Sequence, residues 1–252
     1  MISKSNIKRI TSLQQKKFRS ELGLFIAEGT RLIEEIAKSD YIKVEELYYT
    51  SQWQNEIGLH PAIEEEIALN EMKKISSLTT PSPVLAICKI PNPLFSNIDF
   101  NNNLVLALDT IQDPGNMGTI LRLASWFGVA NIICSNETAD AFSPKVIQAS
   151  MGAIARVKVH YCNLAEKLES LKSTIPVLGS FMNGENIYNI DKTPSGILVM
   201  GNEGNGISHN VEKQITKRIT IPSFTENNSN VESLNVAMAT AVILSELRRK
   251  NR

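Results

Sequence analysis

The sequence has few cysteines and histidines, no long apolar run and no excess of charge of either sign. Its three cysteines, Cys88, Cys134 and Cys162, are too few and too far apart for a disulfide framework, and with three scattered histidines they form no metal-ligand pattern. We therefore expect no metal site, and reduced thiols as in a cytoplasmic protein. No segment approaches the roughly 18–20 apolar residues that span a bilayer. No apolar stretch follows the first basic residues, as one would in a secretory signal, so we expect no membrane partner.

The 252 residues, 42% hydrophobic and 21% charged, are enough for one or two globular domains. The clearest change in composition is the segment IPNPLFSNIDFNNN at residues 90–103, which is rich in proline and asparagine. Proline disfavours a helix there and the polar run disfavours a buried strand. We predict a domain at residues 1–90, a linker at 91–102 and a second domain at 103–252.

Charge is unevenly distributed, although 26 basic residues balance 26 acidic ones overall. Residues 1–19 hold no acid, and we expect their basic side chains to contact RNA phosphates: Lys4, Lys8, Arg9, Lys16, Lys17 and Arg19. Apolar residues at helical spacing among them predict an amphipathic helix over residues 6–19. An ordinary solvated helix face is the alternative interpretation of the same charges.

The first domain is predicted to be a small α/β domain. Short apolar runs predict strands at residues 24–27, 44–49 and 84–88, and the spacing predicts a helix at 30–38. The acidic stretch 61–69 begins with proline, which suits a first helical position, and we predict a second helix there.

The second domain shows a clearer alternation. Apolar runs predict strands at residues 104–108, 131–134, 157–161, 176–178, 197–200 and 218–221. Helices are predicted at 117–127, from the Ser-Pro pair at 143–144, at 164–172 and at 233–250. Apolar strands separated by helices indicate a parallel sheet covered on both faces. Such a sheet binds ligands beyond the carboxyl ends of its strands.

Three segments follow predicted strands and could carry chemistry. The first, Asp109–Gly128, reads DTIQDPGNMGTILRLASWFG. We interpret Asn116 as the N-cap of a helix and place Arg122 in its second turn, where a cation can meet a phosphate or a polarised hydroxyl. The alternative is a cap and a surface arginine without further roles.

The second segment, VMGNEGNGIS, has glycines that let a ligand approach the backbone, and it carries Glu203. Its G-x-x-G-x-G spacing differs from the dinucleotide-binding pattern, and a mere tight loop remains an alternative. The third segment runs from Ile219 to Leu247, where Ser233 and Asn235 stand at the start of a helix. A simple serine N-cap is the alternative there.

In their order, the three segments closely resemble the SpoU (TrmH) family of S-adenosylmethionine-dependent RNA ribose methyltransferases. The resemblance rests on DPGNMGTILR, on MGNEGNGIS, and on IP followed by ESLNVAMA; FSPKVIQASMGAIARV is similar to the segment between the blocks. KFRSELGLFIAEGTRLIEEI and TPSPVLAI resemble, more loosely, the substrate-binding domain of rRNA-directed members.

The resemblance implies a C-terminal trefoil knot, which general folding rules disfavour, and a homodimer formed through the catalytic domain. It implies a site for S-adenosyl-L-methionine made largely by backbone groups around Ser180, Gly201, Ile221 and Leu234. The loop SFTENNSNVE lacks the usual glycine and is longer than typical, which puts the backbone contacts of that site in doubt.

The resemblance also implies that Arg122 and Asn116 lie at the reacting ribose, that Glu203 and Asn235 position Arg122 and the pocket loops, and that Ser233 forms a hydrogen bond near the ribose. Because a guanidinium is a very poor base, Arg122 is easier to understand as stabilising the developing alkoxide than as accepting its proton. The implied activity is 2'-O-methylation of structured RNA, with 23S-type rRNA favoured. The alternatives are a tRNA methyltransferase and a non-catalytic RNA-binding factor. No residue pattern identifies the target nucleotide.

Overall fold

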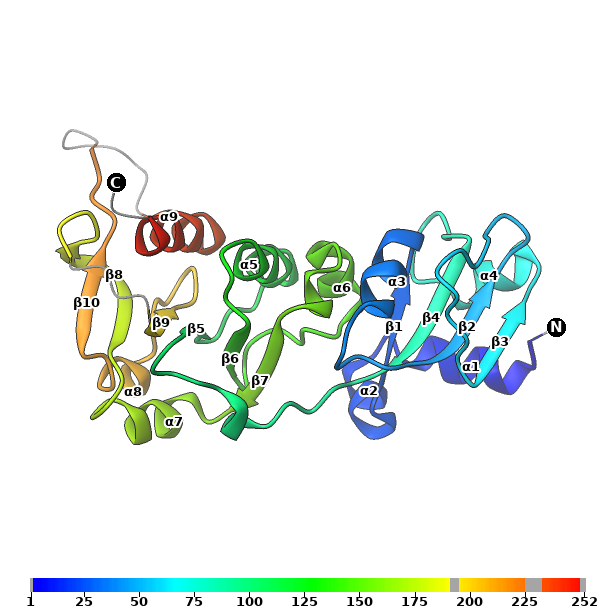
Figure 1. The fold of residues 1–252 in the computed structure, drawn as a ribbon, viewed down its shortest axis with the longest axis horizontal. Coiled ribbons are helices and arrows are strands. Elements are labelled where there is room, and N and C mark those ends of the chain that lie inside the picture. The colour runs from blue at the N-terminus through cyan, green and yellow to red at the C-terminus, as the bar shows by residue number, and fades with distance from the viewer. Residues whose placement is uncertain (1, 191–194, 225–232, 250–252) are drawn as a thin grey trace. The chain divides into compact units, whose positions relative to one another are not determined.

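The computed structural model describes residues 2–190, 195–224 and 233–249. The chain divides into two compact units, one of residues 1–92 and 140–156 and one of residues 93–139 and 157–252 (Figure 1). Each unit contains its own β-sheet, which confirms the predicted mixed α/β class. None of the helices in the described ranges combines the length and apolar character that crossing a bilayer requires.

The sheet of the first unit has the strand order β1-β4-β2-β3. Its strands are β1 (Leu24–Glu28), β2 (Val44–Tyr49), β3 (Ile63–Glu66) and β4 (Val84–Lys89). The central β4 is antiparallel to β1 and β2, whereas β3 pairs with β2 in parallel. The three strands that the sequence predicts are confirmed to within a residue or so at their ends.

Helices α1 (Lys4–Ser12) and α4 (Leu69–Ile75) pack together and share a core with the strands. Fully buried Ile10, Tyr48 and Met72 lie in that core. Helix α3 (Thr30–Ala37), predicted at 30–38, contacts β1 and β4. Strands β1, β2 and β4 are buried at most of their residues, whereas β3, at the edge of the sheet, is largely exposed.

Two predictions for this unit are wrong. The helix expected at residues 6–19 is interrupted: α1 ends at Ser12 and α2 spans Lys16–Leu22. The chain turns at residues 13–15, and this turn places Leu13, which is fully buried, in the core. The helix expected at residues 61–69 does not form: Ile63–Glu66 pairs with β2 as an edge strand, and the next helix, α4, begins only at Leu69, so sheet pairing overrides the local helical pattern.

Residues 140–156 belong to the first unit, although they lie within the predicted second domain, residues 103–252. They contain α6 (Pro144–Ser150), whose predicted start is confirmed by the Ser143 hydroxyl accepting the N–H of Val146, and a 3-10 turn, η2 (Ala153–Ala155). Helix α6 packs on β1, and the rings of Phe25 and Phe142 have centroids 5.0 Å apart. A segment distant in sequence thus completes the core of this unit.

The second unit is built on six parallel strands in the order β10-β8-β9-β5-β6-β7, which confirms the predicted parallel sheet. The strands are β5 (Leu104–Leu108), β6 (Asn131–Ser135), β7 (Lys158–Cys162), β8 (Val177–Asn186), β9 (Gly196–Met200) and β10 (Lys217–Thr220). Strand β8 is much longer than predicted. Its pairing with β10 jumps from Gly179 opposite Arg218 to Glu185 opposite Ile219, so residues 180–184 lie outside that ladder.

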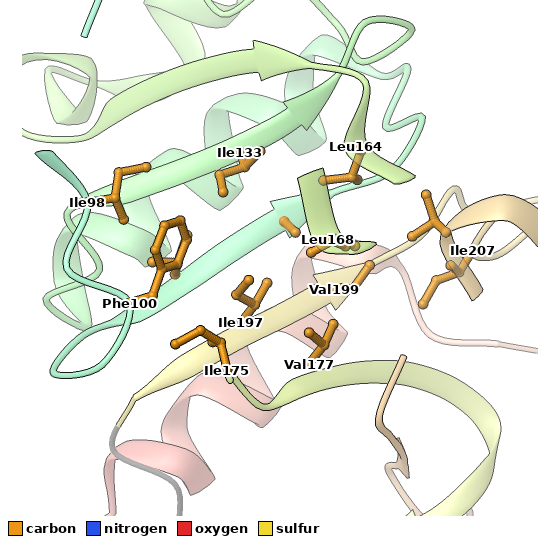
Figure 2. Packing of buried hydrophobic residues seen from close by; sticks show 13 residues of the cluster. Ile98, Phe100, Ile133, Leu164, Leu168, Ile175, Val177, Ile197, Val199 and Ile207 are labelled. Atoms are coloured by element: carbon orange, nitrogen blue, oxygen red, sulfur yellow. The ribbon is translucent and has the colours of Figure 1, made fainter. Parts of the chain in front are cut away.

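Helices lie on both sides of this sheet (Figure 1). Helix α5 (Pro114–Trp126) packs against α9 (Val236–Arg248) on one side. On the other side, α7 (Leu164–Leu171) and the short α8 (His209–Glu212) cover buried strand residues such as Val177, Ile197 and Val199 (Figure 2). Ile98 and Phe100, from the predicted linker, are buried in the same cluster. The linker is therefore packed at its carboxyl-terminal end.

Candidate active site

The three segments singled out in the sequence follow β5, β9 and β10, at the carboxyl edge of the parallel sheet. Strands β5 and β9 are neighbours, and their last residues, Leu108 and Met200, lie opposite each other. The N–H of Asp109 donates to the carbonyl of Met200 at 2.9 Å. The first and second segments therefore leave the sheet side by side.

Helix α5 starts earlier than predicted. Its N-cap is Asp113, whose carboxylate accepts the N–H of Asn116 at 2.7 Å, and Pro114 stands in the first turn. The prediction that Asn116 is the N-cap is wrong, and Arg122 falls in the third turn instead of the second. Because Asp113 satisfies the backbone at the helix start, the side chain of Asn116 is available for contacts with other elements.

Asn116, from the first segment, forms hydrogen bonds with one residue from each of the other two segments. Its Nδ2 donates to the Glu203 carboxylate, and its Oδ1 accepts from Nδ2 of Asn235 at 3.0 Å. Asn235 in turn caps α9: its Oδ1 accepts the N–H groups of Ala237 (2.9 Å) and Met238 (3.3 Å). The alternative of Ser233 as the cap of this helix is therefore wrong.

The α9 cap fixes the direction of this hydrogen-bonded chain. Amide oxygen and nitrogen are usually assigned from their surroundings, and here the helix N–H groups require an acceptor, so Asn235 must turn its oxygen toward α9. Its Nδ2 then faces Asn116, which must present an oxygen to it and its own Nδ2 to Glu203. The chain ends on a group that accepts hydrogen bonds, the carboxylate.

Arg122 stands apart from this chain. It is exposed on α5, about 9 Å along the helix axis from Asn116. In the part of the chain that the structure describes, nothing forms a hydrogen bond or an ion pair with its guanidinium, including Glu203 and Asn235, which were expected to position it. Ser233 is also exposed. The structure thus brings Asn116, Glu203 and Asn235 together and leaves Arg122 open to a ligand.

The loop that carries Glu203 folds back on itself. Asn202 and Gly206 exchange both backbone hydrogen bonds at 2.9 Å. A Cβ added to Gly201 would lie 2.4 Å from the backbone of Gly206 and Ile207. Glycine at 201 was interpreted from the sequence as room for a ligand, and the structure shows that the loop's own backbone requires it as well.

The expected cofactor residues follow three neighbouring strand ends, because β8 lies between β10 and β9. Ser180 begins the segment of β8 outside the β10 ladder, Gly201 follows β9 and Ile221 follows β10. Leu234, 51% exposed, precedes the cap of α9. Glycine-rich backbone beside half-buried and exposed aliphatic side chains fits a nucleoside-containing cofactor. Most of the loop SFTENNSNVE, residues 225–232, lies outside the described residues.

Sequence reasoning missed the residues that hold the Glu203 loop. Asp109 is 1% exposed and its carboxylate accepts the N–H of Ser208 at 2.7 Å. Thr110 has a φ of 58°, which is rare for a β-branched residue. Its carbonyl accepts from Nδ2 of Asn202 at 2.8 Å. A carboxylate directly after an apolar strand was the signal available for Asp109.

The basic residues predicted to bind RNA divide into two sets. Lys4, Lys8, Lys16 and Lys17 are exposed. Arg9 contacts Glu46 at 2.6 Å, and this hydrogen bond raises the pKa of the Arg9 guanidinium. Arg19 is 3% exposed, donating to Asp140 at 2.6 Å and to the carbonyl of Leu13 at 2.8 Å. Arg19 therefore holds the first unit together and is not part of an exposed basic surface.

The chain is similar to known proteins along most of its length. Residues 103–245 match the SpoU rRNA Methylase family and residues 4–86 match the MRM3-like substrate binding domain. A solved structure of a TrmH-family protein from Porphyromonas gingivalis is 39% identical, covers 98% of both chains and has a TM-score of 0.89. The AdoMet-bound rRNA methyltransferase from Sinorhizobium meliloti is 27% identical over 98% of this chain and 96% of its own, with a TM-score of 0.86.

A further relative is the 23S rRNA (guanosine(2553)-2'-O)-methyltransferase RlmP of Bacillus subtilis (strain 168), 29% identical over 96% of this chain and 95% of its own. The parallel sheet with three segments meeting at its carboxyl edge, together with the family match over residues 103–245, defines an RNA methyltransferase fold. The chain belongs to the SpoU rRNA methylase family.

Proposed function

We propose that this protein transfers a methyl group from S-adenosyl-L-methionine to a ribose 2'-hydroxyl of ribosomal RNA, with 23S-type rRNA as the substrate. The observation that carries the proposal is the convergence of all three family segments on Asn116. The full-length similarity to a 23S rRNA 2'-O-methyltransferase supports rRNA over tRNA. So does the match of residues 4–86 to a substrate-binding domain.

S-adenosylmethionine supplies a methyl group on a sulfonium sulfur, and Ser180, Gly201, Ile221 and Leu234 are the residues proposed to hold it. A neutral hydroxyl is a weak nucleophile, so the protein must orient it and stabilise the charge that develops on its oxygen. Arg122 is exposed and unpaired within the described ranges, so it is free to bind the ribose oxygen or the adjacent phosphate.

Asn116 is held in one orientation by two partners, and its amide can retain one further N–H for the RNA. We assign Glu203 and Asn235 to orienting Asn116, and Ser233 to a hydrogen bond near the ribose. The hydroxyl proton leaves to solvent, because a protonated guanidinium has no lone pair with which to accept it, and Arg122 stabilises the charge left on the oxygen.

We propose that residues 1–90 bind the RNA substrate, that 91–102 link the domains and that 103–252 catalyse methyl transfer. The exposed lysines at positions 4, 8, 16 and 17 contact phosphates. Family membership further supports a C-terminal trefoil knot, a homodimer formed through the catalytic domain and action in the cytoplasm.

Incubation of the protein with labelled S-adenosylmethionine and purified rRNA or tRNA tests the proposal. Transfer to 23S rRNA at a ribose 2'-oxygen is expected, and comparing 2'-O-methyl sites in rRNA from cells with and without the gene identifies the nucleotide. Transfer to tRNA alone would show that the substrate is tRNA and not rRNA. Cofactor binding without transfer to any RNA would contradict the activity. Salt-dependent RNA binding without cofactor affinity would indicate a non-catalytic RNA-binding factor.

Substitution of Lys16 and Lys17 by alanine tests the RNA surface. If each contacts a phosphate, the slope of log affinity against log salt concentration falls by about 1 per lysine. Lys213→Ala, an exposed lysine of the second unit, is the matched control. An unchanged slope in the double variant would remove this surface from the RNA interface.

A further inference from the structure

The loop that carries Glu203 is hydrogen-bonded to Asp109 and Thr110, the two residues that directly follow β5. Near its start, Nδ2 of Asn202 donates to the carbonyl of Thr110 at 2.8 Å. At its end, the N–H of Ser208 donates to the buried carboxylate of Asp109 at 2.7 Å. Both ends of the loop therefore depend on the backbone and side chain of Asp109–Thr110.

The Thr110 backbone has an unusual conformation that aims its carbonyl at Asn202. A positive φ in a β-branched residue costs free energy and persists only where neighbours enforce it. Here the Thr110 N–H donates to the hydroxyl of Ser135 at 3.0 Å, and the Thr110 hydroxyl donates to the carbonyl of Asp109 at 2.8 Å. The contact with Asn202 is thus part of a network that holds this turn.

Asn202 also shapes the loop from inside. Its Oδ1 accepts the N–H groups of Gly204 at 2.9 Å and of Asn205 at 3.1 Å. The two halves of one side-chain amide therefore act in different directions: the oxygen closes the turn around Glu203, and the nitrogen attaches that turn to Thr110. Glu203 follows Asn202 directly and cannot shift without disturbing these bonds.

We propose that Asn202 is a positioning residue for methyl transfer: by its bond to Thr110 it holds the Glu203 carboxylate where it orients the Asn116 amide. The proposal rests on the function proposed above. Asn202 itself touches neither reacting group; it acts through Glu203. Loss of the bond to Thr110 removes the side-chain attachment next to Glu203 and leaves the one at Ser208, so the Asn116 amide is no longer held in one orientation.

The test is a double-mutant cycle of Asn202→Ala and Glu203→Ala in the full-length protein, measured as methyl transfer to the RNA that the unaltered protein modifies. Displacement of a reacting group by about 1 Å costs about a hundredfold in rate, so we expect kcat of Asn202→Ala to fall between about tenfold and a hundredfold, with KM for RNA little changed. The double variant is expected to be no slower than Glu203→Ala alone, because the two residues act in series. Full kcat in Asn202→Ala, or losses that multiply, would overturn the proposal.

Two further variants separate positioning from folding. Asn205→Ala changes an exposed side chain of the same loop and should keep full activity. Asn202→Asp retains the acceptor for Gly204 and Asn205 but sets an oxygen against the Thr110 carbonyl, and it should lose rate as Asn202→Ala does. Full activity of Asn202→Asp would show that the bond to Thr110 is not needed.

A readout independent of catalysis is the NMR signal of the Asn116 side-chain amide. It should shift in Asn202→Ala and stay in place in Asn205→Ala. If the unaltered protein transfers no methyl group to any RNA, the proposed function fails; the positioning of Asn116 by Asn202 is then judged on this signal, and an unshifted signal in Asn202→Ala refutes it.

Discussion

The side-chain amide of Asn116 donates a hydrogen bond to the carboxylate of Glu203, 87 residues further along the chain. The direction of that bond is set at the start of α9. There the side-chain oxygen of Asn235 accepts helix N–H groups, so only its Nδ2 can face Asn116, as a donor. A structural cap thus determines which atoms of Asn116 face the second segment. The site is therefore sensitive to changes that exchange donors for acceptors without altering shape.

Asn116→Asp is the sharpest such change. The new side chain is nearly isosteric and can still accept from Asn235, but it sets a carboxylate oxygen against Glu203. Like charges at hydrogen-bond distance repel, so we expect a larger loss of kcat in Asn116→Asp than in Asn116→Ala. Steady-state methylation kinetics measure both. Equal loss in the two variants would show that repulsion between the new carboxylate and Glu203 adds nothing, and full activity in both would show that the bond to Glu203 has no part in turnover.

Arg122→Ala should abolish turnover while leaving stability and cofactor affinity nearly unchanged. The side chain is exposed, and its guanidinium makes no hydrogen bond or ion pair in the described ranges, so its removal breaks no contact of the folded protein. Arg122→Lys keeps the charge but not the planar fork and should recover only part of the rate. Single-turnover kinetics, calorimetric titration with S-adenosylmethionine and thermal unfolding measure the three quantities. Normal turnover in Arg122→Ala would refute the proposed role.

Much of the architecture could be predicted from the sequence because the strands of a covered parallel sheet are apolar throughout. Five of the six predicted strands of the second unit match to within a residue or so, whereas β8 was recognised only over its apolar start. Its polar extension is recruited by pairing with β10, a long-range contact that local composition does not encode. The same applies to β3, a run of glutamates paired with β2.

The sequence predicted which residues lie in the site but not which hydrogen bonds join them. Family segments placed Asn116, Glu203 and Asn235 at one edge, yet the partner expected for the latter two was Arg122, not Asn116. Asp113 lies three residues before Asn116 and is an equally good cap, and only the fold decides between them. The hold of Thr110 on Asn202 depends on backbone conformation, which the sequence does not show.

Gly201→Ala should destabilise the second loop and weaken cofactor binding. The added Cβ would lie 2.4 Å from backbone atoms of Gly206 and Ile207, which cannot move aside as a flexible side chain could. Gly204→Ala, in the same loop, places its Cβ 3.6 Å from the nearest atom, an ordinary contact, and serves as the matched control. Calorimetric titration with S-adenosylmethionine and thermal unfolding measure the two effects. Equal cofactor affinity and equal stability of the two variants would contradict the close approach of Gly201 to the backbone of Gly206 and Ile207.

Arg19→Ala should destabilise the first unit by about 3 kcal/mol, because it leaves the Asp140 carboxylate without its partner in a largely buried pair. Lys38→Ala breaks an exposed ion pair with Glu35 and should cost less than about 1 kcal/mol. Chemical denaturation measures both. A loss for Arg19→Ala no larger than that for Lys38→Ala would argue against a structural role. Deleting residues 1–90 would be a poorer test, since it also removes the strand on which α6 packs.

His160 should make the second unit less stable in mild acid. The ring is 3% exposed, its Nε2 lies 3.1 Å from the Asn131 oxygen and its centroid lies 4.9 Å from that of Phe95. Burial lowers the pKa of His160 below its ordinary value of 6.5. The backbone of Pro93 opposes this in part, and the charges of Lys158 and Lys167 add smaller effects that lower the pKa.

Because its pKa is depressed on folding, His160 binds a proton more readily in the unfolded chain. The contribution of neutral His160 to the free energy of unfolding is therefore fully present above pH 6.5. It is lost as the pH falls from 6.5 toward the lower pKa that His160 has in the folded protein. His160→Gln should flatten this part of the profile, while His209→Gln, at an exposed histidine, should leave it unchanged. Urea denaturation from about pH 7.5 to about pH 5 measures the slopes. Parallel profiles for the unaltered protein and His160→Gln would contradict the burial of a neutral ring at this position.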